Sequence, residues 1–372
     1  MKLVKFAGKA IQRMIPFIIE ERTVWERLAE TRKPIVLYGM GLGAEKILRI
    51  LKTYQVTVAD IFASDEFVRG QSFYSWQVKT LDEVQARYDD FIIVVAFAFW
   101  QEELLRRVEA LGKRYELYAP HVPVVGGEAV DRPYLDRHEA AIQAAYRLMA
   151  DEQSRRVYAA VWNYKLSGKI SYIREVTTSK QEAYSLIRPI AEDVYLDLGA
   201  YDGDTIREMM EQAGSPLREV IALEPDPKNF RKLSAFAETC SGDLRLLNAG
   251  IYDRDTAVLF ANKAGRHSAV SRDGEGIAVP MRSIDSVVGE ESVTIIKMDV
   301  EGEEAKALAG GKTVLARDCP RLIVSAYHRN EDTFALPLQI HAMNPVYRIY
   351  LRQHPYIPAW DNNLYAVKEG FE

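Results

Sequence analysis

The sequence lacks an excess of positive charge, and this absence bears on its partners. Its 372 residues carry 48 basic and 53 acidic side chains, a formal net charge of −5. A nucleic-acid-binding domain is usually basic or carries a basic stripe on one face. We therefore expect no nucleic acid among the partners of this protein.

Cysteine and long apolar runs are also scarce. Cys240 and Cys319 have no CxxC or histidine spacing that would indicate a zinc site or a disulfide framework, and they are typical of a reducing compartment. The longest apolar run, FIIVVAFAFW at 91–100, has the length of a buried strand and is shorter than the roughly 18 residues that indicate a membrane span. We expect a cytoplasmic protein without a spanning helix.

The N-terminus combines four basic residues between positions 2 and 13 with a broad apolar face, and we expect a helix within residues 1–30. One interpretation is a peripheral contact of residues 1–20 with an anionic membrane surface. The other, which we favour, is a helix docked on its own protein or on the second subunit of a homodimer.

Strand and helix patterns alternate in two separate parts of the chain, residues 31–126 and residues 191–372. This alternation predicts an α/β fold with a parallel, doubly wound sheet in each part. Residues 127–190 have only helical periodicity and are predicted to form a helical bridge. The second series closes with YRIYLRQH and NLYAVKE, which we expect to form an antiparallel hairpin at the sheet edge.

The segment DLGAYDGDT at 197–205 lies where the first strand of the second sheet turns into a helix. Ligands of doubly wound sheets bind at this place. Gly199 and Gly203 remove side chains where the backbone must approach a ligand, and Thr205 is expected to cap a helix that begins at Ile206. The GxxxG spacing differs from the GxGxxG fingerprint of dinucleotide sites.

Three carboxylates at this corner, Asp197, Asp202 and Asp204, indicate the charge of the ligand. They repel a phosphate and attract a cationic sulfonium or ammonium group. A positively charged nucleoside is therefore the expected ligand. Glu224 ends the second strand, where an acidic side chain accepts hydrogen bonds from ribose hydroxyls, and Asn248 ends the third, where it is expected to face the adenine edge.

The motifs DLGAYDGDT, ALEPD, NAGIYD, KMDVEGEE and SAYHR, in this order, resemble the FkbM family of S-adenosylmethionine-dependent methyltransferases over roughly residues 185–367. The pair DLGAYDGDT and MDVEGEE is more specific than either motif alone. The resemblance implies a class I methyltransferase sheet, S-adenosylmethionine as cofactor and, usually, O-methylation. The expected cofactor-binding residues are Asp197, Gly199, Ala200, Tyr201, Asp202, Gly203, Thr205, Glu224, Pro225 and Asn248.

Methyl transfer to a hydroxyl requires an aligned nucleophile and a group that takes its proton. Asp299 and Glu301 end the fourth strand and His328 follows the fifth, so we expect these three residues to be catalytic. Asp299 is expected to act as base or to orient the acceptor, and His328 to take a proton near neutral pH. An alternative role for Asp299 with Glu301 is to hold a divalent metal, which prefers oxygen ligands.

Other charged residues near this segment have simpler interpretations. Glu303 and Glu304 are expected only to complement the N-terminus of the next helix. Lys297 either pairs with a carboxylate or contacts an anionic acceptor. GGKT at 310–313 is not a phosphate loop, because the first glycine of GxxxxGK[ST] would fall at Lys306.

GMGLGA at 39–44 has the form GxGxxA between a strand and a helix, with Asp60 19 residues beyond Gly41. This first unit resembles the small Rossmann-like domains that precede some FkbM-type methyltransferases and certain sugar acyltransferases. Two interpretations stay open. Either it binds a nucleotide-sugar, with phosphate at Gly39, Gly41 and Gly43 and ribose at Asp60, or it is a scaffold.

The leading hypothesis is a methyltransferase that uses S-adenosylmethionine to methylate a hydroxyl of a sugar, glycan or secondary metabolite. The sugar is implied by the family resemblance alone. A second hypothesis is a nucleotide-dependent oxidoreductase or epimerase run by the first domain, with the C-terminal domain as an accessory module. A third is a structural partner protein that binds neither ligand.

Overall fold

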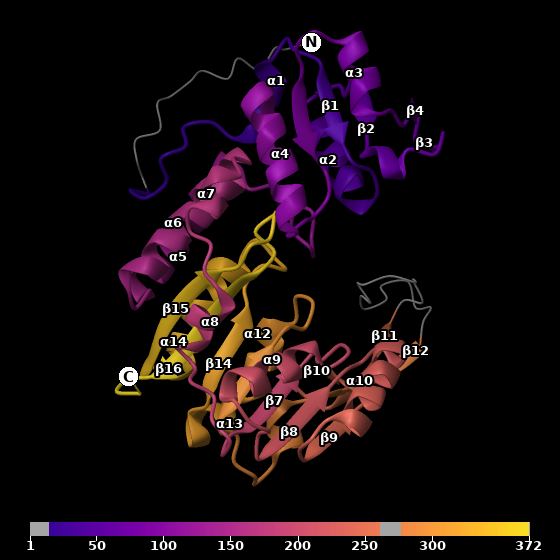
Figure 1. Ribbon diagram of the computed structural model, residues 1–372. Coiled ribbons are helices and arrows are strands. Elements are labelled where there is room, and N and C mark those ends of the chain that lie inside the picture. Colours follow the sequence, from indigo (N-terminus) through magenta and orange to yellow (C-terminus); the bar gives the residue numbers. More distant parts are fainter. Residues whose placement is uncertain (1–14, 261–276, 372) are drawn as a thin grey trace.

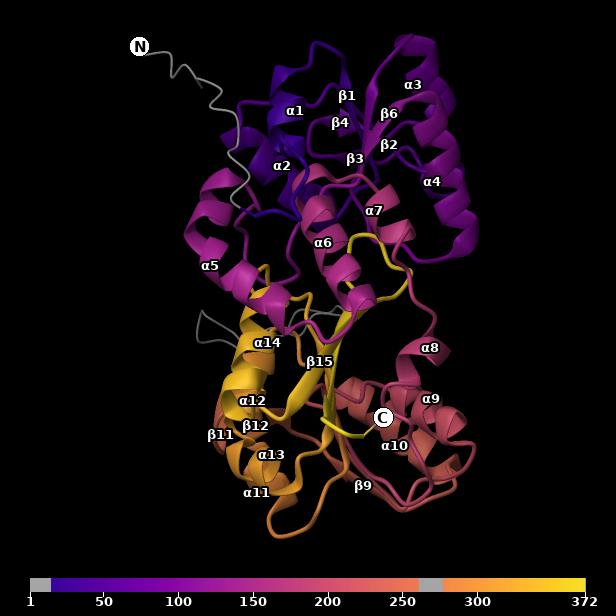
Figure 2. The ribbon, with the colours of Figure 1, turned by 90° about the vertical axis from the view of Figure 1, so that its left-hand side faces the viewer.

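The computed structural model describes residues 15–260 and 277–371, which form two α/β sheets joined by helices (Figure 1). The first sheet lies at the top of Figure 1 and the second at the bottom. After a turn of 90°, the joining helices are seen between the two sheets (Figure 2). Within the described ranges, no helix is long and apolar enough to cross a membrane.

The first domain is built on a four-stranded parallel sheet. Its strands are β1 (Ile35–Tyr38), β2 (Asp60–Phe62), β5 (Ile92–Val95) and β6 (Glu116–Tyr118), and its helices are α2 (Leu42–Thr53), α3 (Leu81–Arg87) and α4 (Glu102–Arg114). The strand order is β2-β1-β5-β6, and β1, β2 and β5 are buried at every position, as expected for parallel strands covered on both faces. The short elements η1 (Asp65–Phe67), β3 (Ser72–Phe73) and β4 (Trp76–Gln77) were not predicted, because such lengths leave no periodic pattern.

Four helices form the bridge between the sheets. They are α5 (Arg132–Leu148), α6 (Glu152–Ser167), α7 (Ser171–Arg174) and α8 (Lys180–Tyr184). The side chains of Asp131 and Asp151 cap α5 and α6, and Gly168 in the left-handed conformation ends α6. All four helices lie within the predicted bridge, whereas the exact domain boundaries stay predictions.

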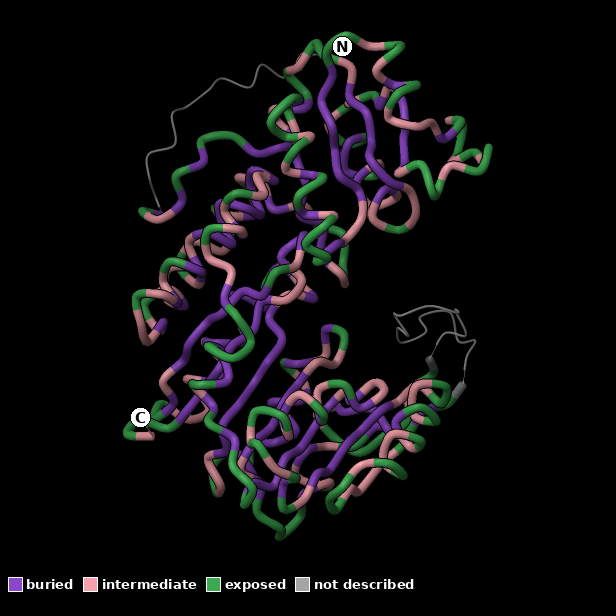
Figure 3. The backbone as a smooth tube through the Cα atoms, in the orientation of Figure 1, coloured by how far each residue is buried: buried purple, intermediate pink, exposed green. Residues whose placement is uncertain are grey.

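The second domain is a seven-stranded sheet covered by helices on both faces. Its strands are β7 (Val194–Leu198), β8 (Glu219–Leu223), β9 (Leu244–Leu247), β13 (Ile295–Met298), β14 (Arg321–Ser325), β15 (Tyr347–Gln353) and β16 (Asn362–Lys368). Its helices are α9 (Asp204–Ala213), α10 (Pro227–Thr239), α11 (Ile284–Val288), α12 (Glu304–Ala309), α13 (Lys312–Asp318) and α14 (Asp332–Met343). The central strands of both sheets are buried (Figure 3).

The strand order of this sheet is β15-β16-β14-β13-β7-β8-β9. The five strands from β14 to β9 are parallel, and β16 is antiparallel to both of its neighbours. The order reverses between β7 and β13, which makes this the switch point where ligands of doubly wound sheets bind. The predicted α/β fold class and the antiparallel hairpin at the edge are confirmed.

A separate three-stranded sheet beside the second domain was not predicted. It consists of β10 (Gly250–Ile251), β11 (Thr256–Phe260) and β12 (Ile277–Arg282), in the order β10-β12-β11. We expected one strand over 244–252, but the Ala249 N–H bonds to the Leu247 carbonyl and turns the chain between β9 and β10. We did not predict β12 because it contains Pro280, and proline is disfavoured in strands. In the structure, Pro280 pairs with Ala257 of β11.

The helix predicted within residues 1–30 falls partly on residues 1–14, which lie outside the described residues. Of residues 15–30, the segment Val24–Glu30 (α1) is helical and the residues before it are not. The Asn163 side chain on α6 instead bonds to three backbone groups of residues 17–20. The described part of this segment therefore docks on the bridge of its own chain. The membrane contact and the homodimer stay predictions.

The two domains contact each other through loops that follow strands of their sheets. Residues 119–128, which follow β6, contact residues 326–330, which follow β14. The Val125 N–H donates to the His328 carbonyl at 2.8 Å, and the Asn330 amide donates to the carbonyl of residue 128 at 2.7 Å. The first domain thus fixes the backbone of the loop that carries His328.

Candidate active site

Two glycines shape the turn between β7 and α9. Gly199 has φ 86° and Gly203 has φ 89°, a region that side-chain-bearing residues rarely adopt. A Cβ at Gly199 would overlap the carbonyl oxygen of Asp299, and a Cβ at Gly203 would overlap the Phe236 ring. The glycines therefore let the β7 turn pass against the end of β13 and against α10.

Thr205 does not cap α9 as the sequence analysis expected. The helix begins at Asp204 with Gly203 as its N-cap, because the left-handed glycine starts the helix earlier than Ile206. The Thr205 hydroxyl instead donates to Asp197 Oδ2 at 2.5 Å. Thr205 thus holds the end of β7 against the first turn of α9.

Asp197 faces the interior of the sheet. It is fully buried, and Lys297 Nζ lies 3.2 Å from its Oδ1 and also donates to the Gly199 carbonyl at 3.2 Å. Burial lowers the pKa of Lys297, but Asp197 and the nearby carboxylates raise it above its usual value, so the ammonium stays charged. The Asp197 charge is therefore compensated within the protein.

Glu224 lies beside the glycine turn at the end of β8. Its Oε2 accepts the Tyr201 N–H at 2.9 Å and its Oε1 accepts the Asp226 N–H at 2.8 Å. Burial raises the pKa of Glu224 to about 7, although the two backbone bonds oppose this shift. Each carboxylate oxygen has a second lone-pair site, so the group retains capacity for two further donors.

The remaining predicted cofactor residues lie around these two groups. Ala200 is buried and donates its N–H to the carbonyl at the end of β8, and Asp202 is half-buried, whereas Asp204 is exposed. Asn248 Nδ2 donates to the carbonyls of Glu224, at 2.8 Å, and Pro225, at 3.3 Å. The structure therefore brings all ten residues to the carboxyl ends of β7, β8 and β9, next to the switch point.

Asp299 follows β13 on the other side of the switch point. Its carboxylate accepts the Tyr327 hydroxyl at 3.1 Å, and His328 Nε2 lies 3.4 Å from its Oδ1. Burial alone would raise the pKa of Asp299, but Lys297, His328 and Tyr327 hold it below its usual value. The side chain is 34% exposed, so an anionic carboxylate faces the space above the strand ends.

His328 is buried among three carboxylates. Its Nδ1 lies 2.9 Å from Glu304 Oε1, and its Nε2 lies 3.4 Å from Asp299 Oδ1 and 3.7 Å from Glu301 Oε2. Burial lowers the pKa of His328, but the carboxylates, with Glu304 first among them, raise it to about 10. The raised pKa favours the protonated imidazole at neutral pH, and the role of His328 as a group that takes a proton there stays a prediction.

Glu304 is the residue that the sequence analysis missed. It is the first residue of α12 and is fully buried, and its Oε1 also accepts the Val300 N–H at 2.9 Å. Glu303, by contrast, pairs with Lys306 at 2.7 Å near the surface. A signal was present in the sequence, because the last acid of EGEE begins a helix whose first turn faces back toward the strand end.

The same cluster is the place where a divalent metal was considered. Ligand atoms of Asp299, Glu304 and His328 lie within 4.8 Å of one another. Both ring nitrogens of His328 lie close to carboxylates, and the raised pKa of His328 favours the protonated ring. A protonated imidazole is not a metal ligand. The cluster has the short charge-to-charge distances of an ion-pair network, and a divalent metal held by Asp299 with Glu301 stays a prediction.

The glycine corner of the first domain has the backbone that its motif predicts. Gly39 and Gly41 have positive φ, and a Cβ at Gly43 would overlap the Ala96 carbonyl oxygen. Asp60 does not reach this corner. It begins β2, is buried, and pairs with Lys79 at 2.6 Å and with Arg87 at 3.3 Å. The predicted ribose contact of Asp60 is therefore wrong, whereas a bound nucleotide-sugar stays a prediction.

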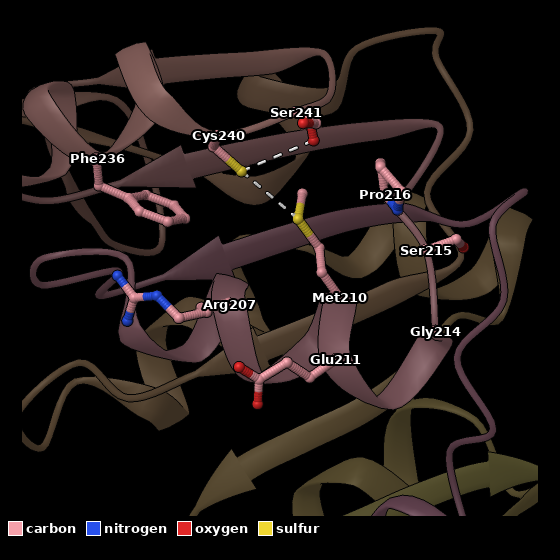
Figure 4. A pocket seen from close by; sticks show the side chains of 9 residues that line it. All are labelled: Arg207, Met210, Glu211, Gly214, Ser215, Pro216, Phe236, Cys240 and Ser241. Carbon is pink, nitrogen blue, oxygen red and sulfur yellow. Dashed lines mark hydrogen bonds between the residues drawn. The ribbon is translucent and has the colours of Figure 1, made fainter.

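A hollow of about 320 Å³ lies between α9 and α10 (Figure 4). Its walls include Met210 and Cys240, whose sulfur atoms are 3.6 Å apart. Both cysteines of the chain are free thiols. Of the described residues that line this hollow, none belongs to the predicted site, so it is separate from the strand ends that carry the candidate chemistry.

Comparison with known proteins gives a match to one domain model and a shared fold. Residues 197–358 match the sequence model described as the Methyltransferase FkbM domain. The chain is 29% identical to 2-O-methyltransferase NoeI of Sinorhizobium fredii (strain NBRC 101917 / NGR234) over 38% of this chain and 65% of that protein. The match therefore spans just under two thirds of that relative's length.

The whole fold also has a solved counterpart. The crystal structure of methyltransferase FkbM from Methylobacillus flagellatus KT is similar with a TM-score of 0.72, at 21% identity, and covers 95% of each chain. Because this coverage is nearly complete, the shared fold includes the first domain and the helical bridge as well as the second sheet.

Proposed function

Because residues 197–358 match the Methyltransferase FkbM domain, we propose that this chain transfers a methyl group from S-adenosylmethionine to a hydroxyl of a sugar, glycan or secondary metabolite. One observation carries the proposal. At the switch point, the Gly199 turn, the Glu224 carboxylate and the Asp299 carboxylate come from three adjacent strands and lie at one edge of the sheet.

The residues at this edge fit the cofactor. The left-handed glycine turn leaves backbone without side chains next to the strand ends. Glu224 is fixed by two backbone N–H groups and has lone pairs left for the two ribose hydroxyls. Asp202 and Asp299 add negative charge on either side of the turn, which favours a sulfonium. S-adenosylmethionine bound here supplies an activated methyl group.

The protein has to orient the acceptor hydroxyl and remove its proton. Asp299 is partly exposed at the end of β13 and its pKa is lowered, so it would accept that proton as the oxygen–methyl bond forms, the sulfur–methyl bond breaks and S-adenosylhomocysteine leaves. A weakly basic carboxylate suffices, because a hydroxyl oxygen becomes strongly acidic as a third bond forms on it. The Tyr327 hydroxyl and His328 hold the carboxylate in place.

The acceptor class is supported by the relative that shares this domain. NoeI is a 2-O-methyltransferase, which favours an oxygen acceptor for this chain. The extension to a sugar or glycan hydroxyl belongs to the proposal, as do the cytoplasmic location and S-adenosylmethionine as cofactor.

Calorimetry on the full chain tests the cofactor. We expect S-adenosylmethionine to bind, Glu224→Ala to weaken binding by about 10-fold or more, and Glu219→Ala to leave it unchanged. Glu219 is a matched control because it begins the strand that Glu224 follows and lies at its opposite end. Binding of NAD without S-adenosylmethionine would instead favour the oxidoreductase or epimerase hypothesis.

Mass spectrometry tests the reaction. The protein is incubated with isotopically labelled S-adenosylmethionine and a panel of sugars, glycans and polyhydroxylated metabolites, and products are searched for a gain of one methyl group. We expect an O-methylated product that Asp299→Asn forms much more slowly. A methyl group found on nitrogen or carbon would refute the proposed acceptor class.

A further inference from the structure

Both nitrogens of the His328 ring lie close to carboxylates on different elements. Glu304, on α12, is 2.9 Å from Nδ1, and Asp299, after β13, is 3.4 Å from Nε2. His328 is 1% exposed and Glu304 is fully buried, so neither has water as an alternative partner. A buried imidazole in this position has its orientation set by the carboxylate on its far side.

Glu304 is itself held rigidly. Its Oε1 accepts the Val300 N–H at 2.9 Å and the Gly302 N–H at 3.4 Å, both from the turn that joins Asp299 to α12. The His328 backbone is fixed independently, because its carbonyl accepts the Val125 N–H of the first domain. Glu304 thus positions the His328 ring, and the first domain positions the His328 backbone.

A second buried acid, Asp332 at the start of α14, influences the charge of this group. Burial, followed by the charge of Glu304, raises the pKa of Asp332 to about 7. Asp332 therefore takes up a proton more readily than an ordinary carboxyl group. The other titratable groups near the ring are Asp299, Glu301 and Tyr327.

We propose that Glu304 is a positioning residue for methyl transfer, which holds His328 as an imidazolium beside the carboxylate of Asp299. This inference rests on the proposed function. Asp299 is then kept anionic and correctly turned for the acceptor hydroxyl, without Glu304 touching either substrate. Glu304 positions His328, His328 positions Asp299, and Asp299 acts on the acceptor hydroxyl.

The test compares Glu304→Gln with the wild type. Glutamine keeps the volume and an oxygen for the Val300 N–H but removes the charge that holds the Nδ1 proton. We expect kcat to fall by about 10- to 100-fold, with KM for S-adenosylmethionine within about twofold of the wild type. Glu303→Gln is the matched control, because it removes the neighbouring carboxylate, which pairs with Lys306, and it should keep wild-type kcat.

The pH profile gives a readout that loss of packing alone would not produce. In the wild type, His328 is expected to stay protonated through the neutral range, since its pKa is raised to about 10. In Glu304→Gln, burial still lowers this pKa while the strongest opposing charge is gone, so the ring should lose its proton at lower pH. The variant should therefore lose activity as pH rises through neutrality, where the wild type does not.

NMR of protein labelled at its six histidines follows the His328 ring directly and needs no acceptor. A His328 that titrates near its ordinary pKa in the wild type overturns the proposal, and this measurement decides even if Glu304→Gln fails to fold. A folded Glu304→Gln with wild-type kcat and pH profile also overturns it. A wild type that methylates no acceptor refutes the proposed function instead, so the two failures are distinguishable.

Discussion

Lys297 and Asp197 are direct partners on the adjacent strands β13 and β7, and their charged groups lie 3.2 Å apart in the interior of the sheet. The pair changes the electrostatic description of the cofactor corner. Asp197 is not a free negative charge that faces the ligand, since its charge is matched within the protein. The carboxylates that attract a cationic ligand are then those nearer the surface, which include Asp202 and Asp299.

Replacing Lys297 by methionine should therefore destabilise the protein strongly. The change leaves the Asp197 carboxylate buried without its cation, which costs about 3–5 kcal/mol in comparable buried pairs. Chemical denaturation of the variant measures the loss. Lys312→Met, at an exposed position on α13, is the control and should change stability by less than about 0.5 kcal/mol. Equal stabilities of the two variants would contradict the structural role of the pair.

S-adenosylmethionine binding should depend on pH through Glu224. Burial raises the pKa of this group to about 7 in the free protein, so it is largely protonated below that pH. Ribose hydroxyls donate best to the ionised carboxylate, and binding then lowers the pKa and releases a proton. Affinity should therefore rise with pH up to about 7 and level off above it, with a limiting slope of about tenfold per pH unit.

Calorimetry at a series of pH values, in buffers of different ionisation enthalpy, measures both the affinity and the proton release. Glu224→Gln should bind more weakly, with no pH dependence in this range. If the wild-type affinity is the same on both sides of neutrality, the ribose does not bind to Glu224 as proposed.

Many of the helices and strands could be predicted, because the local sequence determines where they form. Buried parallel strands are mostly apolar, and β5 is one example, so their alternation with helices was visible. The positions of Gly199, Glu224 and Asp299 followed, since the carboxyl ends of parallel strands meet at one edge. Short or proline-containing strands such as β12 were missed, because their patterns are weak.

The partners of buried charges were not predictable, because they depend on which strands become neighbours. Lys297 is 100 residues from Asp197 in the chain and is brought to it by the pairing of β13 with β7. Glu304 was assigned to the helix N-terminus alone, since its contact with His328 exists only after α12 folds back toward the end of β14. The sequence indicated where the chemistry lies but not how its charges are balanced.

Activity should be independent of divalent metal ions. His328 lies between Glu304 and Asp299 and its pKa is raised to about 10, so a metal would have to displace its proton to bind there. We expect methyl transfer at full rate after exhaustive dialysis against a chelator, and no gain on addition of Mg²⁺ or Mn²⁺. Loss of activity that either ion restores would reassign Asp299 and Glu301 to a metal site.

Two glycine substitutions distinguish two reasons for a glycine. One is the strain of a left-handed backbone, and the other is the close contact of the β7 turn with the end of β13. Gly214 ends α9 with φ 69°, and a Cβ there would meet no atom within 4 Å. Gly214→Ala should therefore cost about 1–2 kcal/mol of stability, measured by denaturation, and leave S-adenosylmethionine affinity unchanged.

Gly199→Ala carries a similar strain at φ 86°, but its Cβ would also overlap the carbonyl oxygen of Asp299. The overlapping atom is backbone and cannot turn aside, so the ends of β7 and β13 have to separate. We expect a stability loss larger than that of Gly214→Ala by about 1–3 kcal/mol, together with a loss of S-adenosylmethionine binding. The two substitutions differ in the overlap with the Asp299 carbonyl. If both variants bound S-adenosylmethionine equally well, the Gly199 turn would not be part of the cofactor site.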